Sequence, residues 1–156
     1  MTKKIATFFL FFILFGCGFS PIYTSKSDLK FNLEILNSVG DKEINKYISN
    51  NLKKYTDKNL DEKIIIKIDT SYSKINISKD SKGSSTGYKL IAKTRFNITS
   101  NEKKDNVSFT EKLILNRFDD VFEEKRYETK LKEDIAILTV IKLFRYLKIL
   151  RIIVLS

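Results

Sequence analysis

The side chains that could carry chemistry fall into three groups: paired carboxylates, one thiol and a row of cations. Asp119–Asp120 and Glu123–Glu124 could in principle serve acid–base catalysis or bind Ca²⁺. The chain has no histidine and one cysteine, which excludes an imidazole-dependent triad, an internal disulfide and a Cys/His zinc site. No phosphate-binding or nucleophile motif accompanies the acidic pairs. Solvated charges in a loop and at a helix start explain the pairs better, so we expect no enzyme, no cofactor and no metal.

The thiol belongs to Cys17, which ends a segment with the pattern of an export signal. Two lysines near the N-terminus precede an apolar run over residues 5–15. As a helix this run would measure about 16 Å, well short of the roughly 30 Å hydrocarbon core of a bilayer. Leu14-Phe15-Gly16 stands directly before the cysteine, as in the cleavage box of bacterial lipoprotein signals. The pattern predicts a signal peptide over residues 1–16 and a diacylglycerol on the Cys17 sulfur; the alternative is an uncleaved signal anchor.

A lipidated Cys17 would tether the mature chain to a membrane, because two or more acyl chains anchor a protein stably. Gly18 follows the cysteine where an aspartate would retain such a lipoprotein in the inner membrane, so we expect the outer membrane. Residues 17–27 hold the only proline and are expected to be a lipidated linker. Residues 28–156 then form a single periplasmic domain, with the tail 149–156 left open between helix, edge strand and disorder.

The cations stand out because the chain carries a net charge of +10. Such an excess favours an anionic partner, and the export signal argues against nucleic acid. The high content of Lys, Asn and Ile offers another explanation, a compositional drift without function. The most specific candidates are Lys89, Lys93 and Arg95, whose two- and four-residue steps place them on one face of a strand. We interpret them as candidate ligands for phosphate groups, with an ordinary solvated face as the alternative.

Hydrophobic periodicity predicts the elements that position these side chains. Period-two alternation indicates strands at 29–35, 64–70, 88–98 and 107–116, whereas helical spacing indicates helices at 44–55 and 123–148. The predicted order is therefore β-α-β-β-β-α. Short connections predict an antiparallel meander for the last three strands, and a helical connection predicts parallel pairing of the first two. The fold class is α+β, with two helices packed on one face of a four-stranded mixed sheet.

Three details of this pattern make sharper predictions. Asp41 stands where the first helix needs an N-cap. Beyond Tyr72 the apolar positions change phase, which predicts a bulge or bend near Ser73–Lys74. In the long second helix, the expected buried stripe comprises Leu131, Ile135 and Leu138.

The mature start Cys17-Gly18-Phe19-Ser20-Pro21-Ile22-Tyr23, followed by this order of elements in about 140 residues, resembles the LPS-assembly lipoprotein family (LptE, also called RlpB). Proteins of that family often begin with a Cys-Gly-Phe-x-Pro-Leu-Tyr-like segment, and Ile22 takes the leucine place here. The resemblance implies a partner, the outer-membrane barrel LptD, with the lipoprotein seated inside it as a plug. It also implies binding of lipopolysaccharide. The apolar C-terminal sequence ILRIIVLS departs from the polar helix end expected for the family.

An auxiliary lipoprotein of an ABC-type lipid transporter has a similar size and start, and it is the alternative function. The two functions differ in the partner, a barrel in one case and an inner-membrane transporter in the other.

Overall fold

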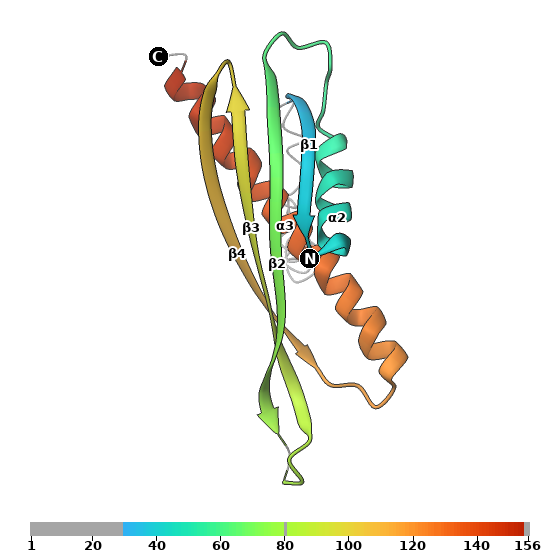
Figure 1. Cartoon of the computed structure of the whole chain (residues 1–156). Coiled ribbons are helices and arrows are strands. Elements are labelled where there is room, and N and C mark those ends of the chain that lie inside the picture. The colour runs from blue at the N-terminus through green and yellow to red at the C-terminus, as the bar shows by residue number, and fades with distance from the viewer. Residues whose placement is uncertain (1–29, 80, 155–156) are drawn as a thin grey trace, which may run out of the picture.

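The computed structural model describes residues 30–79 and 81–154, which form one sheet and two helices (Figure 1). The predicted signal peptide 1–16, Cys17 and the linker 17–27 lie outside the described residues, as do the last two residues of the tail. The elements follow the predicted order β-α-β-β-β-α: β1 (Asn32–Gly40), α2 (Lys42–Lys53), β2 (Lys63–Lys79), β3 (Ser85–Ser100), β4 (Lys103–Asn116) and α3 (Val121–Val154).

The sheet has the strand order β1-β2-β3-β4, so each strand pairs with its neighbour in the sequence. β1 runs parallel to β2, and the other two pairs are antiparallel. Even-numbered residues of β2 up to Thr70, and of β3 from Leu90 to Ile98, are buried on the side that the helices cover. The predicted α+β fold, with two helices on one face of a mixed sheet, is confirmed. We call the uncovered side the open face.

A tight turn joins β1 to α2 and depends on Gly40. Its φ is 97°, and a Cβ atom at this position would lie 1.7 Å from the carbonyl oxygen of Thr70 on β2. Only glycine fits there without moving the neighbouring strand. Asp41 then caps α2 as predicted, because its carboxylate accepts a 2.9 Å hydrogen bond from the amide of Ile44. From Ile44 onward, every fourth residue of the helix is buried against the core.

Several elements are longer than the periodicity predicted. β1 continues beyond residue 35, the predicted end of the first strand, as far as Gly40. β3 and β4 extend into the connection expected between residues 98 and 107 and leave a turn of two residues, Asn101 and Glu102, which have φ values of 46° and 66°. A two-residue hairpin turn of this kind matches the twist of the strands. α3 extends through residue 154, so most of the tail is helical.

The predicted bulge near Ser73–Lys74 is wrong. β2 pairs with β3 without interruption from Ile64 to Asn76, and the register shifts only beyond that point. Side chains keep alternating along an unbroken strand, so the change of apolar phase places Ile75 and Ile77 on the open face. The change of apolar phase therefore marks a newly exposed surface, and the irregularity of β2 lies beyond Asn76 and not at Ser73–Lys74.

α3 packs along the sheet through a broad buried arc. Leu131 and Ile135 are buried as predicted, but Leu138 is 38% exposed and its predicted burial is wrong. At about 100° per residue, the arc is centred near Thr139 and Leu143, and Leu138 lies at its edge. No helix of the described chain combines the length and the apolarity needed to cross a membrane. Among residues 121–150, whose side chains are described, the buried positions of α3 are Leu131, Lys132, Ile135, Ala136, Thr139, Val140, Leu143 and Leu147.

A charged cluster joins the first half of α3 to α2 and the sheet; it comprises Asp41, Glu43, Tyr72, Lys74, Glu124, Glu128 and Lys132. Lys132 is buried and donates hydrogen bonds to Asp41 at 3.0 Å and to Glu43 at 2.8 Å. Its ammonium group also lies 4.3 Å from the centre of the Tyr72 ring. Burial opposes the charge on Lys132, but the two acidic partners outweigh it and raise its pKa.

Candidate functional site

The predicted cations lie on the open face of β3, as its alternation requires. Lys93 and Arg95 are exposed and Lys89 is half-buried, whereas Leu90 and Phe96 of the same strand are buried in the core. The predicted site residues therefore share one face of one strand. Which groups surround each of them depends on the neighbouring strands.

Arg95 has a partner for its charge. It pairs with Asp69 of β2 in the sheet register, and its guanidinium nitrogen lies 3.8 Å from the carboxylate oxygen. Lys93 lies between Ser71 and Thr110 in the register, and no described carboxylate forms an ion pair with it. A phosphate group would therefore meet more uncompensated positive charge at Lys93 than at Arg95.

Lys89 lies between two exposed isoleucines. The register places Ile75 of β2 on one side of it and Ile114 of β4 on the other. Ile114 is 63% exposed and Ile75 is 49% exposed. Directly opposite residues in adjacent strands have Cβ atoms about 4.5–5.5 Å apart, so the three side chains are in contact range.

Two more isoleucines extend this surface, which we call the isoleucine patch: Ile75, Ile77, Ile91 and Ile114. Ile77 follows two positions after Ile75 on β2 and is 48% exposed. Ile91 is half-buried and pairs with Lys112 of β4. The patch is thus interleaved with amines on two strands, Lys89 and Lys112.

The sequence alone did not single out Lys112 or β2's part of this surface. Alternation along β4 placed Lys112 opposite the buried face, but only the β3–β4 register brings it next to Ile91. The signal for Ile75 and Ile77 was the change of apolar phase beyond Tyr72. Such a change of phase arises from a bulge in the strand, and also from a regular strand whose apolar residues move to the other face of the sheet. The sequence alone could not distinguish these two structures.

The open face can bind a partner that is both apolar and anionic. Contiguous exposed apolar side chains mark interaction surfaces, and single exposed isoleucines would not. Lysine amines donate charge-assisted hydrogen bonds to phosphate or carboxylate oxygens. The described residues contain no group of acidic or sulfur side chains that could hold a metal ion.

The sequence favoured solvated charges for the acidic pairs, and the structure divides them into two contacting and two exposed carboxylates. Asp120 accepts a 2.8 Å hydrogen bond from the amide of Phe122 and so caps the start of α3. Glu124 lies 2.8 Å from the ammonium group of Lys74. Asp119 and Glu123 are exposed. Asp120 and Glu124 therefore hold the start of α3 in place through different partners.

Comparisons with known proteins agree with this fold. Neither a protein-family profile nor a curated protein sequence matches the chain. Among solved structures, lipoprotein B from Nitrosomonas europaea has a TM-score of 0.49 and 16% identity, covering 75% of this chain and 82% of its own. Rare lipoprotein B from Shewanella oneidensis has a TM-score of 0.58 and 11% identity, covering 79% of this chain and 100% of its own. The chain therefore has a fold similar to that of rare lipoprotein B, the fold that the resemblance to the LPS-assembly lipoproteins implied.

Proposed function

We propose that this chain is an outer-membrane lipoprotein of the LPS-assembly type. Cys17 carries the lipid anchor, and residues 28–156 form the periplasmic domain. The domain partners the LptD barrel as a plug and binds lipopolysaccharide during its passage to the outer leaflet. It acts as a binding subunit and not as an enzyme.

One observation carries the proposal: on a fold like that of rare lipoprotein B, exposed isoleucines and amines share the open face. Ile114 and Ile75 flank Lys89 in the register. A monomer has no reason to keep such a row of aliphatic side chains in water, so a partner surface is expected to cover them. Amines among them suit the phosphates of lipid A or polar groups of a barrel wall.

The test is co-purification with the LptD barrel of the same organism after co-expression of both full chains. We expect a stoichiometric complex with the wild-type lipoprotein. The double variant Ile75→Ser/Ile114→Ser should co-purify with much less LptD than the wild type does, because each serine removes apolar contact area and adds a hydroxyl group.

A matched control replaces two exposed aliphatic residues elsewhere, Val121 and Leu60, with serine. This control should retain the barrel. Equal retention by both double variants would remove the open face from the interface. Association with an inner-membrane ABC transporter in place of a barrel would favour the auxiliary-lipoprotein function.

A further inference from the structure

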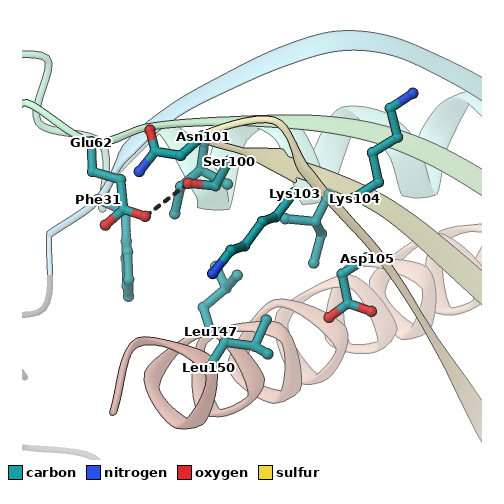
Figure 2. Close-up of a pocket in the computed structure, with 11 residues that line it drawn as sticks. Phe31, Glu62, Ser100, Asn101, Lys103, Lys104, Asp105, Leu147 and Leu150 are labelled. Atoms are coloured by element: carbon teal, nitrogen blue, oxygen red, sulfur yellow. Dashed lines mark hydrogen bonds between the residues drawn. The ribbon is translucent and has the colours of Figure 1, made fainter. Parts of the chain in front are cut away.

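A pocket of about 450 Å³ lies between the sheet and the last turns of α3, on the helix-covered side. Figure 2 shows Leu147 and Leu150 of α3 along one wall, with Phe31 and Lys103 across from them. Two more apolar side chains, Ile64 and Ile98, line the pocket from β2 and β3. The volume falls within the roughly 300–1,000 Å³ of small-molecule sites, and such sites are mainly apolar.

The mouth of the pocket carries acidic and basic side chains, and the acidic ones are already bonded. Glu62 accepts a 2.8 Å hydrogen bond from the hydroxyl group of Ser100. Asp105 accepts a hydrogen bond from the hydroxyl group of Tyr146, and this bond raises the pKa of Tyr146 to about 12. Neither carboxylate forms an ion pair with a described lysine at the mouth.

The lysines at the mouth have no such partners within the described part of the chain. Lys103 and Lys104 form no ion pair or hydrogen bond with another described side chain. Figure 2 shows the amine of Lys103 extending over the pocket toward Leu147, whereas the amine of Lys104 points away. The pocket thus combines an apolar wall with one uncompensated cation above it.

We propose that this pocket binds the alkyl chain of an anionic amphiphile, with the chain against Leu147 and Leu150 and the anionic head group at Lys103. An alkyl chain replaces water on the apolar walls, and a phosphate or carboxylate accepts hydrogen bonds from the lysine amine. The pocket lies on the opposite side of the sheet from the isoleucine patch. It is therefore a second site, and it does not depend on the function proposed for the open face.

Charge decides between the amphiphile classes. One oxygen each of Glu62 and Asp105 is occupied by a hydroxyl donor, which neutralises neither carboxylate. Two lysines match these two acids in number at the mouth, and the amine of Lys103 is the group that extends over the apolar wall toward Leu147. An anionic head group finds Lys103 without a carboxylate partner among the residues that the structure describes. An uncharged head group would leave this amine without an ionic partner, so the anionic class fits best.

The experiment uses the full mature lipoprotein in phosphatidylcholine nanodiscs and a decyl phosphate with a diazirine at the end of its chain. After irradiation, mass spectrometry locates the labelled residues. We expect labelling to concentrate near Ile98, Leu147 and Leu150. Unlabelled decyl phosphate should compete about tenfold better than octyl phosphate, since two buried methylenes contribute about 0.8 kcal/mol each.

Two variants test the two parts of the site. Lys103→Glu should reduce labelling about tenfold, because it replaces an attractive charge at the head group with a repulsive one. Ser100→Phe fills the mouth and should reduce labelling by a similar factor. Lys125→Glu is the matched charge control at the distant start of α3, and it should label like the wild type. Circular dichroism melting curves establish that each variant is folded.

Several results would overturn the proposal. Competition by inorganic phosphate alone would mean that the alkyl chain contributes nothing. Equal competition by decyltrimethylammonium would mean that the site does not select an anion. Absence of label near Leu147 and Leu150 would mean that the pocket is not open to a ligand, as when the chain segment preceding Lys30 fills it.

Discussion

The hydroxyl group of Tyr72 on β2 donates a 2.5 Å hydrogen bond to the carboxylate of Glu128 on α3, 56 positions later in the chain. Glu128 also accepts a 2.9 Å hydrogen bond from Lys74, two residues further along β2. Burial opposes the charge on Glu128, but the bonds from Tyr72 and Lys74 outweigh it and lower its pKa. Burial, together with the same contact, raises the pKa of Tyr72. These bonds fix the first half of α3 over the second half of β2.

We predict that Glu128 makes the stability of the fold depend on acid. Its pKa in the folded chain lies below the ordinary value of 4.5, so the unfolded chain binds the proton first. The stabilisation is then complete above about pH 4.5 and is lost as the pH falls through the folded pKa. Glu128→Gln keeps an oxygen acceptor for Tyr72 but removes the charge facing Lys74.

The variant should therefore be less stable than the wild type at pH 7, and the difference should shrink toward pH 3. Urea unfolding at pH 7, 5 and 3 measures both free energies. Glu133→Gln, an exposed position on the same helix, is the control and should show no such convergence. A difference that stays constant across the pH range would mean that Glu128 carries no linked proton.

A second prediction separates the buried arc of α3 from its edge. Leu143 is fully buried, so Leu143→Ala should lower the free energy of unfolding by about 2–5 kcal/mol. Leu138 is far more exposed, and Leu138→Ala should lower it by only about 1 kcal/mol or less. Denaturant unfolding of both variants measures the contrast. Equal losses would place Leu138 in the core and contradict the orientation of α3.

The third prediction concerns the lipid anchor. Cys17→Ser should leave an unprocessed precursor that takes up no labelled palmitate, because the proposed site of acylation is the cysteine sulfur. Immunoblotting for size and labelling of cells with radioactive palmitate give the two readouts. Ser20→Ala lies three residues further on and should be processed normally. Normal cleavage and labelling of the Cys17→Ser chain would refute the lipoprotein assignment.

The fourth prediction concerns the cations of the open face. Replacing Lys89, Lys93 and Arg95 together with glutamate should weaken binding to lipopolysaccharide strongly. Single substitutions should change it little, because exposed ion pairs contribute only about 0–1 kcal/mol each. Of the single variants, Lys93→Glu should lower the affinity for lipopolysaccharide more than Arg95→Glu, since Asp69 already compensates the charge of Arg95.

Binding of the purified lipoprotein to lipopolysaccharide is measured at low and high salt. Affinity of the wild type should fall with salt, because screening shortens to about 8 Å at physiological ionic strength. A control triple variant with the same change of net charge replaces Lys46, Lys58 and Lys125, which are exposed elsewhere. If both triple variants bind equally well at low salt, the row on β3 is an ordinary solvated face.

Local chemistry made much of the fold predictable from the sequence. Alternation and helical spacing gave the six elements, and the short polar side chain of Asp41 marked the start of α2. The strand register was harder to predict, because it depends on the lengths of the hairpin turns, and the sequence did not determine these lengths. The two-residue turn at Asn101–Glu102 sets the β3–β4 pairing and thereby brings Ile114 next to Lys89.

The sequence predicted which sheet face the helices cover, but it did not predict how α3 crosses the sheet or which distant side chains meet. The pocket beside Leu147 exists because α3 crosses the sheet near the β3–β4 turn, and periodicity carries no crossing geometry. The exposure of Leu138 could not be predicted for the same reason: several arcs of an apolar helix could face the sheet, and periodicity does not determine which one does. The charged cluster likewise joins Lys132 to Asp41 across 91 positions.

The unequal lengths of β1 and β2 divide the sheet into two regions with different backbone protection. β1 pairs with β2 only as far as Thr70, so residues 71–79 of β2 form hydrogen bonds on one side, with β3. Amide hydrogen exchange should therefore be slow up to Thr70 and faster beyond it, with opening that starts at the hairpin tip. The isoleucine patch takes its β2 residues from this less protected half, so a partner that covers the patch should also slow exchange there.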